Sequence, residues 1–190
     1  MRLVLATRNE HKVRELERLM DGVAIEPLPA GVQLPPEDGD TFAANALDKA
    51  RSAAAALGRP AIADDSGIEA AALDGAPGIF SARFAGPDAT DAQNLAKLRA
   101  EAPAGSGLRY VCVMAYAEPG GEARTFTGAC DGALSADARG TGGFGYDPAF
   151  VPADVSDGRT MAELSDAEKD AISHRGRAAR ALLAWLEARP

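Results

Sequence analysis

The first 28 residues alternate between strand-like and helix-like patterns, and this order constrains the fold more than any other feature. Residues 2–6 form a short, mostly apolar run that is typical of a strand, and residues 23–28 form a second. Between the two runs, apolar residues recur at helical spacing. They are Val13, Leu16, Leu19 and Met20. A strand, a helix and a strand in this order predict an α/β fold.

A second helix and another strand follow with clear boundaries. The polar pair at 40–41 is suited to cap a helix over 42–57, and Gly58 is suited to end it. Residues 60–64 return to a strand, which runs directly into Asp64-Asp65-Ser66-Gly67. Because Asp, Ser and Gly are turn formers, we expect the strand to end at this sequence.

The second half of the chain continues the α/β pattern. Residues 108–117 are apolar on both faces of a strand pattern and predict a central strand. Residues 123–130 follow as its hairpin partner after the turn Pro119-Gly120-Gly121. In the helical C-terminal part, Ser165-Asp166-Ala167-Glu168 has the spacing of a capping box. No linker interrupts the chain, so we predict one domain over residues 1–190.

The composition and the lengths of the apolar runs argue against nucleic acid and membranes as partners. The net charge of −8 argues against a protein that grips nucleic-acid backbones, because such binding needs a basic face. A few cations and a metal in one site could still hold a triphosphate. No apolar run approaches the ~20 residues of a membrane helix, and the N-terminus lacks the pattern of a signal peptide. We expect no nucleic-acid partner, no membrane and a cytoplasmic location.

The turn between the first strand and the first helix is a candidate anion site. Free backbone N–H groups and the helix dipole favour anions at a helix N-terminus. The polar residues of this turn are Thr7, Arg8, Asn9, Glu10, His11 and Lys12. A capped helix with solvated polar side chains accounts for the same pattern, so the turn alone does not decide.

The adjacent carboxylates Asp64 and Asp65 are a candidate metal site. Adjacent carboxylates repel, so their placement usually needs a cation or strong donors nearby. Hard oxygen ligands suit Mg²⁺, which uses few carboxylates and keeps several waters. Glu37 or Asp38, in the loop before the second helix, could join such a site. An acidic turn at the surface is the alternative.

The glycine-rich loop at 140–147 is a candidate base-binding segment. Phe144 and Tyr146 could stack on a base, and Asp147 could accept hydrogen bonds from it. The glycines let the backbone approach a ligand closely. A tight turn with two inward-facing aromatic rings is the alternative.

A cationic segment near the last helix is the fourth candidate. Ser173 is suited to cap that helix, which leaves His174 and Arg175 at its N-terminal end, with Lys169 shortly before. Cations are unfavourable at a helix N-terminus, so their presence suggests an anionic or polar ligand partner. A solvated His-Arg pair is the alternative.

Five motifs in this order resemble the inosine/xanthosine triphosphate pyrophosphatases, the Ham1-like family. The resemblance covers nearly the whole chain, and five ordered motifs are far more specific than one glycine-rich loop. They are Ala6-Thr7-Arg8-Asn9-Glu10-His11-Lys12, Ala63-Asp64-Asp65-Ser66-Gly67, Gly75-Ala76-Pro77-Gly78-Ile79-Phe80-Ser81-Ala82-Arg83, Gly142-Gly143-Phe144-Gly145-Tyr146-Asp147-Pro148 and Ser173-His174-Arg175-Gly176. The resemblance implies an elongated α/β fold, with a mixed β-sheet flanked by helices and two lobes around a nucleotide-binding cleft. It also implies a homodimer.

The resemblance further implies Mg²⁺-dependent hydrolysis of unusual purine nucleoside triphosphates (ITP, dITP and XTP) to the monophosphate and pyrophosphate. Asp65 would be the proton acceptor that activates water and also a metal ligand, with Glu37 as the other metal carboxylate. The substrate-binding residues would be Thr7, Arg8, Asn9, Glu10, His11 and Lys12 at the triphosphate, Ser66 and Lys169 on the nucleotide, Phe144, Gly145, Tyr146 and Asp147 at the base, and His174 and Arg175 at its 6-keto edge.

Two departures and two alternatives accompany this resemblance. Many members have Gly where this chain has Arg8, and Glu where it has Ala44, which affects the phosphate turn and the metal site respectively. A Maf-like pyrophosphatase of other specificity is one alternative, but the Ser-His-Arg-Gly and Phe-Gly-Tyr-Asp motifs argue against it. A nucleotide-binding protein without catalysis is the other, and the carboxylate pair with Lys12 argues against that.

Overall fold

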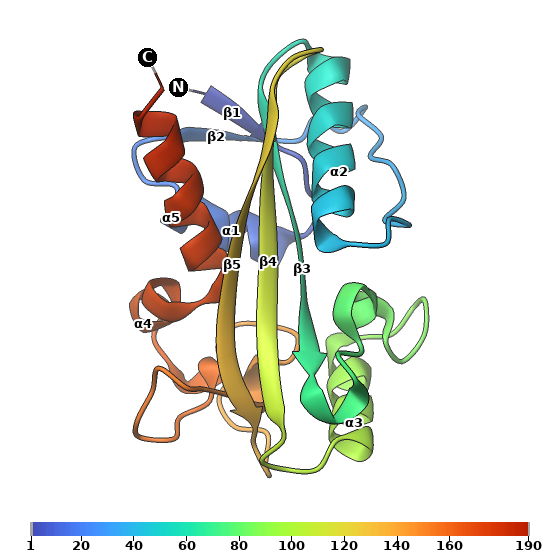
Figure 1. Ribbon diagram of the computed structural model, residues 1–190, viewed down its shortest axis with the longest axis vertical. Coiled ribbons are helices and arrows are strands. Elements are labelled where there is room, and N and C mark those ends of the chain that lie inside the picture. The colour runs from blue at the N-terminus through green and yellow to red at the C-terminus, as the bar shows by residue number, and fades with distance from the viewer. Residues whose placement is uncertain (1, 190) are drawn as a thin grey trace. The chain divides into compact units, whose positions relative to one another are not determined.

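The chain forms two compact units, each assembled from separate stretches of sequence (Figure 1). The computed structural model describes residues 2–189. Unit 1 comprises Met1–Asp65, Cys112–Gly128 and Arg175–Pro190, and unit 2 comprises Ser66–Val111 and Ala129–His174. The boundaries at residues 65, 111 and 128 fall inside strands, so three strands supply residues to both units.

Six strands form one mixed sheet within residues 2–189, in the order β2-β1-β3-β4-β5-β6. Their bounds are β1 Arg2–Leu5, β2 Ala24–Pro27, β3 Ala61–Ala70, β4 Gly107–Ala117, β5 Ala123–Leu134 and β6 Phe150–Pro152. Strand β1 pairs in parallel with both β2 and β3, whereas β5 pairs antiparallel with β6. The predicted α/β class, the central position of β4 and its neighbour β5 are confirmed.

Two helices of unit 1 have caps formed by nearby residues, and those of the second are the predicted ones. Helix α1 (Glu10–Leu19) is capped by Asn9, whose side chain accepts from the backbone N–H groups of His11 and Lys12. Helix α2 (Phe42–Leu57) is capped by Thr41 and ends at Gly58, which adopts the left-handed φ of 62°. Local side-chain and backbone chemistry therefore fixes where these helices start and stop.

The core of unit 1 joins β1, β3 and β4 to helices α1 and α5 (His174–Glu187). Its buried members are Leu3, Leu5, Leu16, Met20, Ile62, Cys112, Met114, Tyr116, Phe126, Ala178, Ala179 and Leu182. The predicted apolar stripe of the last helix packs here, with Leu182 buried and Leu183, Trp185 and Leu186 half-buried against the cluster.

Unit 2 has its own core and its own capped helices. Helix α3 (Asp91–Glu101) starts with a capping box of Thr90 and Gln93, and α4 (Asp166–Ile172) with the predicted box of Ser165 and Glu168. Short 3-10 helices lie at Ala71–Leu73, Gly78–Arg83, Asp147–Ala149 and Met161–Glu163. The buried cluster includes Ile68, Leu98, Leu108, Tyr110, Phe150 and Met161.

The prediction that a strand ends at Asp64-Asp65-Ser66-Gly67 is wrong. Strand β3 continues to Ala70, because Ile68 and Ala70 are buried in the core of unit 2 and this packing overrides the turn propensity of the polar residues. The ladder to β1 does stop early, with Leu5 opposite Ile62 as its last pair. The two carboxylates therefore lie just past the end of β1. No helix in residues 2–189 combines the length and apolar character needed to cross a membrane.

Candidate active site

Asp64 is a completely buried carboxylate surrounded by cations. Its Oδ2 lies 3.1 Å from Lys12 Nζ and 3.1 Å from Arg175 Nη2. Burial opposes its ionisation, but the charges of Lys12, Arg175 and Lys49 outweigh this cost and hold the pKa of Asp64 well below its usual range. Cys112 Sγ lies 4.0 Å from the same oxygen, and burial raises the pKa of this thiol to about 12. Asp64 is thus a fixed negative charge, already paired by protein groups.

Asp65 is in a different environment, although it is the next residue. Successive side chains of a strand point to opposite faces, and Asp65 accepts a hydrogen bond from Asn45 Nδ2 at 2.9 Å. Burial raises the pKa of Asp65 above its usual value, and the nearby Lys49 and Lys12 do not fully offset this effect. Of the two carboxylates, Asp65 is the better proton acceptor, since unequal environments give adjacent acids unequal roles.

Lys49 links the acidic loop to the carboxylate strand. Its buried Nζ donates to Glu37 Oε1 and, at 2.7 Å, to the backbone oxygen of Asp64. Burial disfavours the charged amine, but Asp64, Glu37 and Asp65 together raise the pKa of Lys49 above its usual value. The structure therefore places Glu37 and Asp65 near the same buried lysine.

Sequence analysis missed Lys49 and Asn45 as site residues, although a signal was present. Both lie on the buried stripe of α2, at i and i+4, among small apolar residues. Polar side chains on an otherwise apolar stripe need buried partners. The buried residues of that stripe are Phe42, Asn45, Ala46, Lys49, Ala50, Ala53 and Ala54.

Two carboxylates of this cluster fit a magnesium ion. Among residues 2–189, no group of three or more His, Cys, Asp or Glu side chains forms a ready-made metal cage. Mg²⁺ does not need one, because it is usually held by one or two carboxylates together with waters and substrate phosphates. Glu37 and Asp65 are near enough for the charge of Glu37 to raise the pKa of Asp65. A divalent cation would relieve this repulsion.

The turn at 7–12 joins β1 to the start of α1. Thr7 Oγ1 accepts from the backbone N–H of Asn9 at 3.2 Å, and the Asn9 side chain occupies the N–H groups of His11 and Lys12. Glu10 and His11 are exposed. Lys12 is joined to the carboxylate cluster by an ion pair between its Nζ and Asp64 Oδ2.

Arg8 is hydrogen-bonded to the backbone of the loop that follows β2. Its guanidinium donates to the backbone oxygens of Leu28, Pro29 and Val32 at 2.8–2.9 Å, and to that of Ala30 at 3.3 Å. These bonds turn the side chain toward the loop backbone. The structure thus gives the first departure from the family pattern a clear structural role.

Arg175 closes the buried ion network of unit 1. Its Nη1 donates to Glu15 Oε2, and its Nε and Nη2 donate to Asp64 Oδ2. The residue is 1% exposed. Glu15, on α1, was missed by sequence analysis because a glutamate within a helix carries no local sign that it will be buried against a residue so distant in the sequence.

A second group of predicted residues gathers in unit 2 around Asp147. Its Oδ2 accepts from Lys169 Nζ at 2.6 Å and from the backbone N–H of Phe144 at 3.0 Å. Its Oδ1 accepts from the hydroxyl of Tyr110 at 2.9 Å. The Lys169 ammonium also lies 5.4 Å from the centre of the Phe144 ring. Phe144, Asp147 and Lys169 therefore form one connected group.

The remaining predicted residues of unit 2 have distinct surroundings. His174 is buried and stacks on Tyr110, with ring centres 4.4 Å apart and planes 4° apart. Tyr146 is buried, and its hydroxyl donates to the backbone oxygen of Ser81 at 2.7 Å. The backbone N–H of Gly145 donates to Asp91 Oδ2 at 2.8 Å. Ser66 is half-buried in β3.

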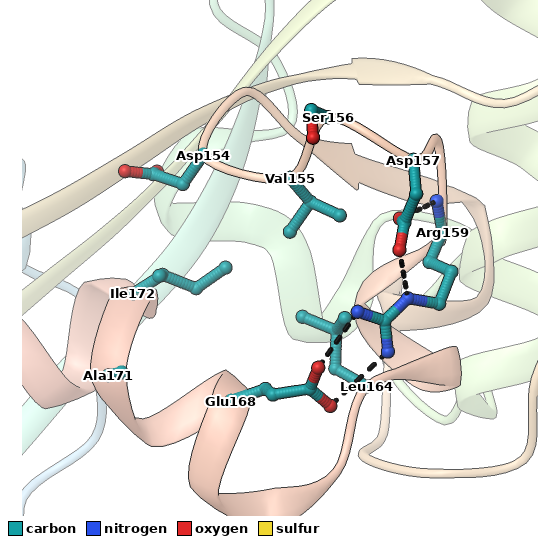
Figure 2. Close-up of a pocket in the computed structure, with 9 residues that line it drawn as sticks. All are labelled: Asp154, Val155, Ser156, Asp157, Arg159, Leu164, Glu168, Ala171 and Ile172. Carbon is teal, nitrogen blue, oxygen red and sulfur yellow. Dashed lines mark hydrogen bonds and ion pairs between the residues drawn. The ribbon is translucent and has the colours of Figure 1, made fainter.

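A pocket of about 350 Å³ opens elsewhere in unit 2, beside α4. Figure 2 shows Arg159 held between Asp157 and Glu168 at this pocket. Apolar side chains, among them Val155, Leu164 and Ile172, line the rest. Its one guanidinium is already paired with two carboxylates, and none of the predicted site residues lines it.

Comparison with known proteins shows which family this chain belongs to. A curated dITP/XTP pyrophosphatase of Desulfotalea psychrophila is 45% identical over 205 residues, which covers 98% of this chain and 89% of that protein. One from Symbiobacterium thermophilum is 49% identical and covers 93% of this chain and 90% of that protein. The solved structure of a HAM1 protein from Coxiella burnetii aligns over the whole of both chains with a TM-score of 0.88 and 40% identity. The profile of the Ham1 family matches residues 3–185, and the chain belongs to this family.

Proposed function

We propose that this chain hydrolyses dITP, XTP and ITP to the nucleoside monophosphate and pyrophosphate. The observation that carries the proposal is the unequal carboxylate pair, in which Asp64 forms ion pairs through Oδ2 with Lys12 and Arg175, whereas Asp65 has a raised pKa. Lys12 and Lys49 place two positive charges beside this pair. The relatives' names supply the substrate class.

Asp65 is the residue that we assign to proton transfer. A carboxylate with a raised pKa is a suitable general base for a water molecule that attacks phosphorus. Lys12 and Lys49 would stabilise charge on the phosphates, as preorganised cations do in phosphoryl transfer. The Thr7 hydroxyl and the Asn9 amide would contribute neutral donors to the triphosphate.

We propose Mg²⁺ as the cofactor, with Asp65 and Glu37 as its protein ligands. When bound, Mg²⁺ neutralises phosphate charge and orients the leaving group. Lys49 would hold Glu37 in place for this task through its hydrogen bond. Asn45 would hold Asp65 in the same way.

The group around Asp147 is our candidate for base recognition. Phe144 is half-buried and offers a ring face for stacking, whereas the Tyr146 hydroxyl is committed to Ser81. His174 and Arg175 would donate to the 6-keto oxygen of hypoxanthine or xanthine, and Lys169 would add a third donor. Adenine presents an amino donor at this position, so donor would face donor and its binding would be disfavoured.

One assay panel tests the function. The protein is incubated with ITP, dITP, XTP, ATP, GTP, CTP and UTP, with and without Mg²⁺, and pyrophosphate and orthophosphate are measured separately. We expect pyrophosphate from the first three, only with Mg²⁺. Orthophosphate as the product would contradict the site of cleavage. A preference for CTP or UTP would favour a Maf-like specificity, and binding without turnover would favour a non-catalytic nucleotide-binding protein.

The proposal extends to domain organisation, oligomeric state and location in the cell. We propose that residues 1–190 act as one functional domain, and that the enzyme works as a homodimer in the cytoplasm with small nucleotides as its partners. Light scattering of the purified protein measures its mass in solution. A monomeric mass at the assay concentration would contradict the dimer.

A further inference from the structure

Tyr110 contacts two residues that we propose for base recognition, although no motif of the sequence includes it. It lies on β4 in unit 2, where burial alternates along the strand, and it is 6% exposed. Its ring stacks on the imidazole of His174, and its hydroxyl donates to Asp147 Oδ1. The Tyr110 side chain therefore contacts both the imidazole ring of His174 and the carboxylate of Asp147.

The stacking contact sets the orientation of His174. The two ring planes are within 4° of parallel and their centres are 4.4 Å apart. An imidazole donates in the plane of its ring, so the plane of Tyr110 determines the directions in which His174 can donate to a base. A tilt of the imidazole would turn its N–H away from a keto oxygen.

The hydroxyl contact sets the orientation of Asp147. With Tyr110 bound at Oδ1, the carboxylate presents Oδ2 to Lys169 and to the Phe144 backbone. Rotation of the carboxylate would break several bonds together. Lys169 and the base-stacking segment are thus held through a carboxylate that Tyr110 fixes from the other side.

The surroundings leave this arrangement little freedom. Phe150 packs against Tyr110 with ring centres 4.6 Å apart, which supports the tyrosine ring in the core. At Gly143, an added Cβ would lie 2.0 Å from Asp147 Oδ2 and 2.9 Å from Lys169 Nζ. The loop backbone therefore approaches the Asp147–Lys169 pair as closely as a glycine allows.

We propose that Tyr110 is a positioning residue for purine recognition, which sets the imidazole plane of His174 and the carboxylate of Asp147. The inference rests on the proposed function, because it assumes that these two residues face the base. Tyr110 would act through them and would not contact the substrate. Its loss should therefore weaken selective nucleotide binding while leaving the chemistry at phosphorus intact.

Three variants test the proposal. Tyr110→Phe keeps the stacked ring and removes the hydroxyl, whereas Tyr110→Leu removes both contacts and stays apolar. Tyr116→Phe is the matched control: it lies on the same strand, its hydroxyl is bonded to Glu118 and Arg189, and it contacts none of the proposed base-reading residues. The measurements are kcat and KM for ITP and ATP, the affinity for IMP and AMP by calorimetry, and the melting temperature.

We expect Tyr110→Phe to raise KM for ITP and Kd for IMP about tenfold, as for the loss of one hydrogen bond to a charged group, with kcat changed by less than about twofold. Tyr110→Leu should lower the preference for ITP over ATP, and for IMP over AMP, by about tenfold or more. Tyr116→Phe should leave both preference and KM unchanged.

Two results would overturn the proposal. One is a Tyr110→Phe protein whose KM and IMP affinity match those of Tyr116→Phe. The other is a Tyr110→Leu protein that loses affinity for inosine and adenine nucleotides equally, as a general loss of structure would cause. If Tyr110→Leu does not fold, Tyr110→Phe decides the question. Failure of the wild-type protein to release pyrophosphate from ITP would instead contradict the proposed function, and the IMP affinities would still test Tyr110.

Discussion

Arg175 and Asp64 form a buried ion pair between residues 111 positions apart in the sequence, with Nη2 3.1 Å and Nε 3.3 Å from the same carboxylate oxygen. Glu15 accepts from the third nitrogen of the guanidinium. Arg175 therefore ties the last helix to α1 and to the carboxylate strand within unit 1. A side chain that sequence analysis assigned to the base thus also supports the carboxylate pair.

Arg175→Ala should destabilise the protein by about 3–5 kcal/mol, because it leaves Asp64 and Glu15 buried without their guanidinium partner. It should also narrow the preference for ITP over ATP. Chemical denaturation and paired kinetic assays measure the two effects. Arg109→Ala is the control, since its pair with Asp131 is exposed and should contribute less than about 1 kcal/mol. Equal losses from both variants would contradict the structural role, and unchanged selectivity would remove Arg175 from base recognition.

Asp65→Asn should lower kcat for pyrophosphate release by about 100-fold or more while nucleotide binding largely survives, because the amide cannot accept the proton of the attacking water. Single-turnover assays with ITP measure the chemical step, and calorimetry with IMP measures binding. Asp131→Asn, at an exposed surface position, is the matched control. Near-normal turnover of Asp65→Asn would refute its assignment as the base.

Lys49→Met should lower kcat/KM for ITP by about 100-fold, since it removes a cation beside the phosphates and releases Glu37. The half-saturating Mg²⁺ concentration should rise as well, because Glu37 loses its fixed position. Lys97→Met is the control: Lys97 also donates to a backbone oxygen, that of Phe84, but makes no contact with the carboxylate cluster. A Lys49→Met protein with an unaltered Mg²⁺ requirement would argue that Glu37 does not bind the metal.

Arg8→Gln should loosen the loop after β2 without unfolding the protein. The variant loses the guanidinium donors to the backbone oxygens of residues 28, 29, 30 and 32. Amide hydrogen exchange over residues 28–34 should become about tenfold faster or more, as local opening becomes easier. Arg14→Gln, an exposed change on α1, should leave that segment unaffected. If KM for ITP rises while exchange stays the same, Arg8 contacts the triphosphate instead.

Arg159→Gln should raise the pKa of Glu168. Hydrogen bonds from Arg159, which Figure 2 shows, and from Ser165 lower that pKa to about 2 in the wild-type protein. Because the folded pKa is depressed, the carboxylate contributes stability above the unfolded value of about 4.5 and loses it as the pH falls toward 2. Carbon-detected NMR titration of the carboxyl group should show the shift. An unchanged pKa would mean that the capping bonds from Ser165 alone hold Glu168 ionised.

The elements that sequence analysis predicted well depend on short-range chemistry. Thr41, Gly58 and Ser165 act on backbone groups within a few residues, so their effects are visible in the local sequence. The order of strands and helices follows from hydrophobic periodicity for the same reason. The burial of Lys49 beside a polar partner could also have been predicted, because a lysine on an apolar helix stripe contradicts the pattern around it.

The features that sequence analysis did not predict depend on residues that are distant in the sequence. Strand β3 continues past Asp65 because Ile68 and Ala70 join the core of unit 2, and no local pattern shows that core. Glu15 is buried against a residue 160 positions away, and Tyr110 reads as an ordinary aromatic residue of an apolar strand. The five motifs identify the family, but they cannot tell which donor each carboxylate of the site accepts.

The interrupted arrangement of the two units has a consequence for synthesis on the ribosome. Unit 2 ends at His174, so all its residues have been polymerised while the final helix is still missing. Unit 1 has its first 65 residues early, yet its last segment begins at Arg175. Asp64 and Glu15 are therefore synthesised well before Arg175, their guanidinium partner. The buried ion network of unit 1 can therefore close only after Arg175 has been synthesised.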